Sequence, residues 1–280
     1  MLSFDFPANE VHLSHLNIVE DTATGCGKMI KPTNSPPLHI KRLSCDALNN
    51  EALISKIFGP AFRDAGSVEC LAIHLRQDPV SIVAYGKLLE SVSSSTKHLE
   101  LASSFHYSDL RTQSIAWDGL CLHSCTSLAS LTLRIDLEPT IIFKYTWINM
   151  LPILLDAPNT IRELTFCCIV TTAIHDVEWP AAPNGLMLMD CVGPLLHTLQ
   201  RIVFRFEMVH DWEKEGAEDW KKWGRDLADG LVRRYQKTCS RLPEGLVHFE
   251  VDYVLPSEDS GLRAPTEAAA PFNALRFFLV

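Results

Sequence analysis

The chain has 280 residues, of which 47% are hydrophobic and 21% charged, so its composition is that of a folded globular protein and excludes wholesale disorder. Its formal net charge of -9 argues against a surface built for nucleic acid. No apolar run reaches the ~20 residues that a membrane span needs. The first twenty residues do not have the positively charged start and apolar run of a secretion signal. We therefore expect neither a nucleic-acid nor a membrane partner, and a cytoplasmic or nuclear location.

The nine cysteines support an intracellular assignment. Their odd number and apolar neighbourhoods favour reduced thiols that pack as small buried side chains. Cys121, His123 and Cys125 are the best candidates for metal ligands, but no second pair stands at zinc-finger spacing. We predict no metal site and no cofactor.

A short apolar pattern, apolar-x-x-apolar-x-apolar, recurs along the chain. The last two apolar residues of each copy alternate with other residues, as on a β-strand with one buried face. The middle position falls at residues 16, 43, 71, 99, 131, 164, 202, 249 and 278, so the first copies stand 27 or 28 residues apart and the later ones mostly further apart. The pattern predicts strands near residues 13–18, 40–45, 68–73, 96–101, 128–133, 161–166, 199–204 and 246–251, with a candidate ninth copy at 275–280.

Most segments between these copies carry a helical pattern. Residues 21–37, rich in Gly, Thr and Pro, predict a loop instead. Apolar residues at helical spacing predict helices over 49–62, 80–93, 147–156, 186–199 and 217–241. Two of these contain Pro152 and Pro194, which should start or kink a helical turn. The clearest pattern is in the last segment, where apolar residues at steps of three and four are Trp220, Trp223, Leu227, Leu231 and Tyr235.

Strand, crossover and parallel strand, repeated about eight times, resemble leucine-rich repeats of the long, helix-containing kind. The resemblance spans the chain from about Leu13 to Val280. It implies an α/β fold: one repeat domain over 1–280, an irregular leucine-rich-repeat-like solenoid with parallel strands on the concave side and helices on the convex side. In this family an Asn normally bonds the backbone in each turn. That Asn is missing here, so we expect a locally distorted solenoid. The corresponding positions hold Asp21, Leu48, Arg76, Ser104, Asp136, Ile169, Glu207 and Val254.

Segments such as SLASLTLRIDL and TIRELTFCCIV, with the irregular spacing and the late Trp-rich helices, resemble the repeat regions of fungal F-box proteins. In such proteins an N-terminal F-box docks a ubiquitin-ligase adaptor, and the repeats bind the substrate. The first forty residues contain a strand copy and a loop rather than an F-box, and Leu242-Pro243-Glu244 runs into an alternating strand. We therefore expect no adaptor binding by this chain.

Residues that flank the two core positions of each copy are expected to face the concave side. This surface is polar and mixed in charge, which suits recognition of another protein, although a sheet face also becomes polar simply by meeting water. Trp212, in a segment of three tryptophans and seven charges before the last helix, is a further candidate contact. The candidate partner-binding residues are His15, Arg42, His74, His98, Glu100, Arg134, Glu163, Arg201, Arg205, His248, Glu250 and Trp212.

No catalytic pattern is complete. Gly25-Cys26-Gly27-Lys28 resembles part of a phosphate-binding loop, but Thr22 and Met29 replace residues that such a loop requires. His74 and His98 have no metal-ligand spacing, and no hydrolase elbow or dinucleotide fingerprint occurs. We predict a non-enzymatic protein-protein interaction scaffold. The alternatives are an α/β enzyme with its active site at the strand ends and a structural subunit that assembles with itself.

Overall fold

The structure, a computed structural model, describes residues 10–14, 39–46, 67–75, 79–103, 117–136, 147, 150–171, 182–209 and 217–254. These residues form an α/β fold with one eight-stranded parallel sheet. Its strands are β1 (Glu10–Ser14), β2 (His39–Asp46), β3 (Ser67–Leu75), β4 (His98–Ser103), β5 (Ser130–Asp136), β6 (Glu163–Thr171), β7 (Arg201–Val209) and β8 (Val247–Val254).

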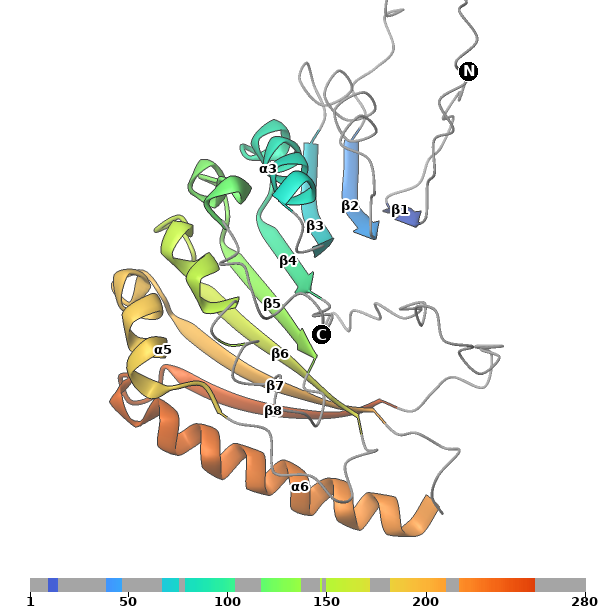
Figure 1. The fold of residues 1–280 in the computed structure, drawn as a ribbon, viewed down its shortest axis with the longest axis vertical. Helices are drawn as coiled ribbons and strands as arrows, with labels where there is room; N and C mark the ends of the chain where they lie inside the picture. Colours follow the sequence, from blue (N-terminus) through green and yellow to red (C-terminus); the bar gives the residue numbers. More distant parts are fainter. Residues whose placement is uncertain are drawn as a thin grey trace, which may run out of the picture.

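The strands lie side by side in the order of the chain, from β1 to β8 (Figure 1). Parallel neighbours have to be joined by a connection that crosses one face of the sheet. The helical segments that the structure describes all lie over the same face (Figure 1). The order of the described strands never reverses, so they form no switch point of the kind at which doubly wound enzymes bind their ligands.

The helical segments confirm the predictions in part. They are α3 (Pro79–Val92), η2 (Trp117–Leu120), η3 (Leu122–Ser124), η4 (Leu151–Asp156), α5 (Gly185–Val192), η5 (Gly193–Leu195), α6 (Ala217–Thr238) and η6 (Cys239–Arg241). Pro152 is the second residue of the 3-10 helix η4, which follows α-helical residues at Trp147 and Met150, and Pro194 lies in the 3-10 turn that follows α5. No helix in the described ranges is long and apolar enough to cross a membrane. The predicted loop 21–37 and helix 49–62 lie outside the described residues.

The predicted repeat is confirmed in register from β2 to β7. The middle apolar positions pair across neighbouring strands in one row: Leu43, Leu71, Leu99, Leu131, Leu164 and Ile202. The following apolar positions form a second row: Cys45, Ile73, Leu101, Leu133, Phe166 and Phe204. Both rows are almost completely buried. Thr96 occupies an apolar position in its copy because its hydroxyl donates to the Val92 carbonyl, 3.1 Å away, inside the core.

The two ends of the sheet correct the predicted register. In β1, Val11 pairs with Leu43, so Val11 takes the place predicted for Leu16, which lies outside the described residues. In β8, Val247 rather than Phe249 pairs with Ile202. At β8 the register differs from the prediction by two residues, which alternation permits because it repeats every two residues. At β1 it differs by five, because Val11 and Leu13 form an alternating apolar pair of their own ahead of Leu16 and Ile18. The candidate copy at 275–280 also lies outside the described residues.

An aromatic cluster joins the helical layer to the sheet at β6–β8. Phe166 and Phe204 are stacked with ring centroids 4.9 Å apart, and Phe204 and Phe249 are stacked at 5.7 Å. Tyr235 of α6 meets Phe204 edge-on at 5.3 Å, and Trp147 meets Phe166 at 5.4 Å. Such aromatic pairs stabilise a core beyond the area they bury, so Tyr235 holds α6 against β7.

Side-chain hydroxyls link successive turns at the strand starts. The Ser127 hydroxyl donates to the Ser94 carbonyl, and the Thr160 hydroxyl donates to the Leu128 carbonyl, each at 2.8 Å. Each bond ties one repeat to the backbone of the repeat before it. These two bonds lie just before β5 and β6.

Gly86 of α3 lies against η2, where an added Cβ would stand 2.0 Å from the Gly119 carbonyl oxygen. Gly86→Ala should push α3 away from η2, and we expect it to lower the free energy of unfolding by about 1–3 kcal/mol. Gly193→Ala is the control, because nothing lies within 4 Å of its added Cβ and its backbone is helical. Urea denaturation measures both variants, and equal losses would contradict the close contact.

Candidate interaction face

Alternate residues of each strand lie on the face opposite the helical layer, which we call the second face. In register they form rows that cross the strands. The first row, nearest the strand starts, is Arg42, Cys70, His98, Ser130, Glu163 and Arg201. The second row is Ser44, Ala72, Glu100, Thr132, Thr165, Val203 and His248. The third is His74, Ala102, Arg134, Cys167, Arg205 and Glu250, and the fourth holds Ile169, Glu207 and Asp252.

This register brings ten of the twelve candidate partner-binding residues to the second face; His15 and Trp212 lie outside the described residues. These ten residues differ in how far they are exposed to solvent. Glu100 is buried, with 8% of its surface exposed, and the Arg134 side chain is 17% exposed. His98 and His248 are exposed, and the Arg201 side chain is 42% exposed. The exposed members are therefore the ones that a partner can reach.

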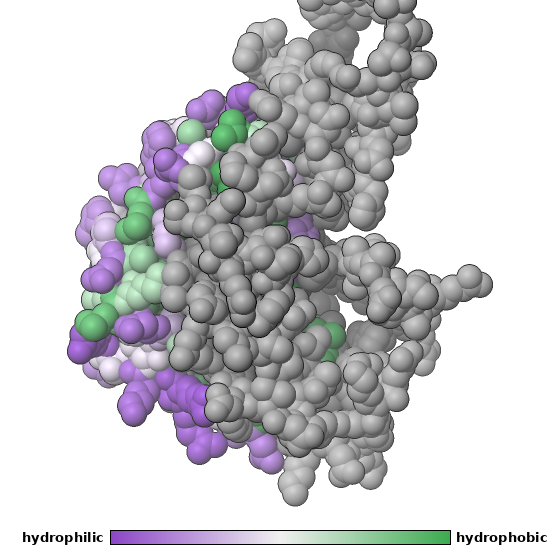
Figure 2. All heavy atoms as spheres, in the orientation of Figure 1, coloured by the Kyte–Doolittle hydropathy of each residue, from purple (hydrophilic) through white to green (hydrophobic). Residues whose placement is uncertain are grey.

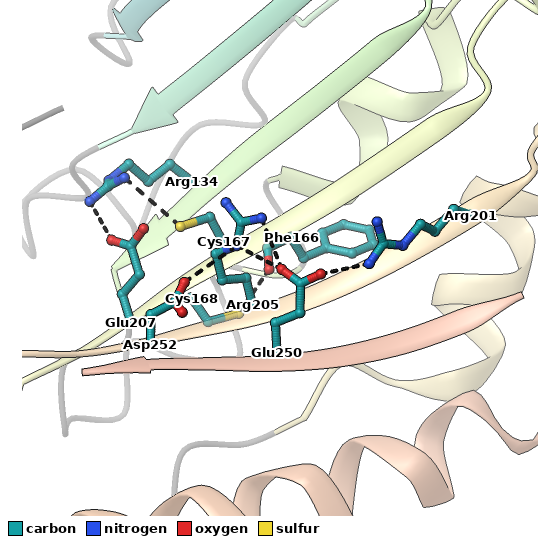
Figure 3. Close-up of polar contacts among 9 residues, drawn as sticks. All are labelled: Arg134, Phe166, Cys167, Cys168, Arg201, Arg205, Glu207, Glu250 and Asp252. Carbon is teal, nitrogen blue, oxygen red and sulfur yellow. Dashed lines mark hydrogen bonds and ion pairs between the residues drawn. The ribbon is translucent and has the colours of Figure 1, made fainter. Parts of the chain in front are cut away.

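Buried Glu100 and largely buried Arg134 form an ion-pair triad with Glu207, whose side chain is 17% exposed. Arg134 of β5 donates from Nη2 to Glu207 Oε2 on β7 at 2.6 Å (Figure 3). Its Nη1 lies 3.8 Å from Glu100 Oε1 on β4. Between Arg134 and Glu207 lies Cys167 of β6, whose Sγ is 3.9 Å from Arg134 Nη1. Removing one member of a buried ion pair is costly, because the other charge is left without compensation. We assign the short Arg134–Glu207 pair to holding β5 and β7 together across β6.

Three part-exposed candidates, Arg201, Arg205 and Glu250, form a second network with Asp252 over β7 and β8. Glu250 accepts from Arg201 Nη2 at 2.6 Å through one carboxylate oxygen, and from Arg205 Nε and Nη2 at 3.0 and 2.9 Å through the other (Figure 3). Arg205 Nε also lies 3.6 Å from Asp252 Oδ2. One carboxylate thus fixes two guanidinium groups on the neighbouring strand. Fixed side chains of this kind lose less conformational entropy on binding than mobile ones.

Glu207 was not among the candidate residues, because the repeat copy near 199–204 ends before it. The signal that reveals it is the alternation itself, which continues through buried Phe206 and Met208 and so places Glu207 on the second face. Strand β7 has nine residues, longer than the six-residue copy. The partner of Arg134 could therefore be found only by extending the strand.

Six of the eight cysteines in the described ranges are buried, as predicted, whereas Cys70 and Cys121 are part-exposed. Burial raises the pKa of the Cys125 thiol to about 11 and that of Cys239 to about 12. Burial, together with the nearby Glu207 carboxylate, also raises the pKa of Cys167. Thiols that stay protonated at neutral pH are poor nucleophiles and poor metal ligands. The eight cysteines in the described ranges are all free thiols.

The predicted metal candidates Cys121, His123 and Cys125 are not held as a common ligand set. His123 Nδ1 pairs with Asp156 Oδ1 at 2.7 Å, and the other oxygen of Asp156 accepts the Leu122 backbone N–H at 2.7 Å. Asp156 therefore joins η3 to the end of η4. In the part of the chain that the structure describes, no group of three or more His, Cys, Asp or Glu residues is arranged to hold a metal ion.

A shallow hollow of about 370 Å³ lies at the starts of β6 and β7. Its lining offers amide and hydroxyl groups and a single guanidinium: Asn159, Thr160, Arg162, Thr198 and Gln200. Both of its hydroxyls, those of Thr160 and Thr198, already donate to backbone carbonyls. The lining contains no paired acid and base, so it does not add a catalytic arrangement.

Comparisons with protein-family models, with curated proteins and with solved structures found no match to this chain.

Glu100→Gln and Glu207→Gln should change stability in opposite directions. Burial raises the pKa of Glu100, Arg134 opposes the rise and Glu207 adds to it. The folded state therefore holds this proton more tightly than the unfolded chain, and the stability that Glu100 contributes at acid pH is lost as the pH rises through its raised pKa. Glu100→Gln should raise the melting temperature at neutral pH, with a smaller gain below the ordinary carboxyl pKa of about 4.3.

Glu207→Gln removes the short ion pair to Arg134 and should lower the free energy of unfolding by about 1.5–3 kcal/mol. Thermal denaturation of both variants across the acid-to-neutral range measures the two effects. Equal destabilisation by both variants at neutral pH would contradict the unequal roles of the two carboxylates.

Proposed function

We propose that this chain is a non-enzymatic scaffold of the leucine-rich-repeat-like kind, which binds another protein through the second face of its sheet. The register of the apolar rows and the placement of the helical segments over one face support a repeat solenoid whose second face is concave. Stacked repeats of this type create extended surfaces, to which each repeat adds a few modest contacts.

The observation that carries the proposal is the part-exposed ion-pair network of Arg201, Arg205, Glu250 and Asp252. A sheet face that only meets water needs polar side chains, and it has no need to fix them across strands. Here one carboxylate orients two guanidinium groups that are each about 40% exposed, at 42% and 40%. Oriented, part-exposed arginines are typical of protein-protein contact surfaces.

The proposed role is recognition, of the substrate-binding kind that the resemblance to the repeat regions of fungal F-box proteins implies. Binding of a ubiquitin-ligase adaptor is not part of the proposal, since the sequence offers no F-box-like helical start in its first forty residues. The surface over the helical layer is a weaker candidate. Hydrophilic side chains cover most of its visible part, with smaller hydrophobic areas between them (Figure 2).

Site-specific photo-crosslinking tests this proposal. A photoreactive residue is placed at His98 or His248, which are exposed on the second face, and in separate variants at Glu90 or Gln236, which are exposed on α3 and α6. After irradiation in an extract of the source cells, we expect one crosslinked protein shared by His98 and His248 and missing from Glu90 and Gln236. A crosslink shared equally by all four positions, or formed only from the helical side, would refute the proposal.

A further inference from the structure

We infer that two copies of this chain pair along the outer edges of their β8 strands, antiparallel and centred on Phe249, so that their two sheets become one. The inference goes beyond the proposed function, because it concerns the edge of the sheet rather than its second face. β8 is the last strand of the sheet, so no described strand pairs with its outer edge. A two-fold pair of identical edges closes the assembly, since each edge supplies the groups that the other needs.

The outer edge of β8 has none of the features that usually keep sheet edges apart. Natural edge strands are short, or they carry Pro, Lys or a bulge that disrupts pairing with another chain. β8 has eight residues, VHFEVDYV, with neither Pro nor Lys. It pairs with β7 in unbroken register over its whole length, so it contains no bulge. Such an edge is a template for one further strand.

The backbone bonding of β8 shows which groups this edge presents. The Ile202 N–H on β7 donates to the Leu246 carbonyl at 2.8 Å, so the backbone carbonyl of Leu246 points toward β7. Successive residues of a strand point their N–H and C=O groups to opposite sides. The residues whose backbone groups point away from β7 are therefore Val247, Phe249, Val251 and Tyr253.

The apolar rows of the core reach this edge without being closed. On β7, Ile202 and Phe204 are completely buried. Their partners in the same rows on β8, Val247 and Phe249, are only partly buried. Further along β8, Tyr253 is 42% exposed. A strand added to β8 would cover these side chains and remove apolar surface from water.

A stack of aromatic rings indicates what continues the core at this edge. Phe166, Phe204 and Phe249 follow one another across the sheet with ring centroids 4.9 and 5.7 Å apart, and each pair is inclined by 19°. In a two-fold pair centred on Phe249, the same residue of the second copy lies directly opposite, at a hydrogen-bonded position with Cα atoms about 5.5 Å apart. The stack then continues across the two-fold axis into the second core.

Charge on the second face selects this register. The axis has to pass through a residue of β8 rather than between two residues, because otherwise the two faces of the sheet would be exchanged. An axis at Glu250 sets two Glu250 carboxylates opposite each other, and an axis at Val251 sets Glu250 opposite Asp252. An axis at Phe249 instead sets exposed His248 opposite Glu250 of the second copy, once on each side. Opposite charges stabilise such a cross-strand pair, and like charges destabilise it.

Sedimentation equilibrium of the purified chain tests the inference, and we expect a reversible monomer–dimer equilibrium. His248→Glu places two carboxylates opposite each other on both sides of the axis and should weaken the dimer roughly 5- to 100-fold. His248→Lys is the matched control, because it changes the same exposed residue and keeps a cation opposite Glu250. Its dimer should be at least as tight as that of the unsubstituted chain.

Amide hydrogen exchange, followed by NMR, tests the edge and its register. The N–H groups of Val247, Phe249 and Val251 should exchange slowly at concentrations where the chain is dimeric, and quickly in monomeric His248→Glu. The Glu250 N–H is the internal control, since it points toward β7 and should be protected in both.

A chain that stays monomeric at every concentration would overturn the inference, even with these amides protected, because the chain itself would then cover the edge. A dimer that His248→Glu and His248→Lys weaken equally would overturn it too, and so would protection that extends to Tyr253, which requires an axis at Glu250 or Val251. None of these results touches the proposed function, which the crosslinks from the second face test separately.

Discussion

In-register parallel pairing of apolar residues is the constraint on which the rest of this structure depends. Leu71 pairs with Leu99, Leu99 with Leu131, and Leu131 with Leu164, so one continuous apolar layer faces the helices. A slip of one residue in any strand would exchange its two faces and place charged side chains in the core. The same pairing therefore fixes which side chains lie on the second face and in which row.

The second face contains two charged networks with different roles. Arg134 and its two carboxylates are shielded from solvent and link strands, which makes them part of the architecture. Arg201, Arg205 and Glu250 are part-exposed and held in fixed positions, which suits them to recognition. Charge alone does not separate the two networks; burial does. A polar face can thus serve stability at its centre and binding at its accessible end.

Much of this arrangement could be predicted from sequence, because alternation and spacing are local. They located β2–β7 and placed ten candidate residues, from Arg42 on β2 to Glu250 on β8, on one face of the sheet. The register at β8 could not be predicted, since an alternating segment also fits its neighbour after a shift of two residues. Nor could that at β1, where two alternating apolar pairs, Val11 with Leu13 and Leu16 with Ile18, offer different registers. Nor could the Arg134–Glu207 pair, whose partners are 73 positions apart and lie on strands separated by β6. Such contacts depend on the assembled register and on side-chain length.

An alanine scan along β7, from Arg201 to Val209, with unfolding and partner binding both measured, tests the account most directly. Ile202, Phe204 and Phe206 are fully buried on the core face, and each truncation should cost about 2–5 kcal/mol of stability. Arg201→Ala and Arg205→Ala should cost less than about 1 kcal/mol yet weaken binding. Stability losses that do not alternate along the strand, or binding that survives the arginine substitutions, would contradict the account.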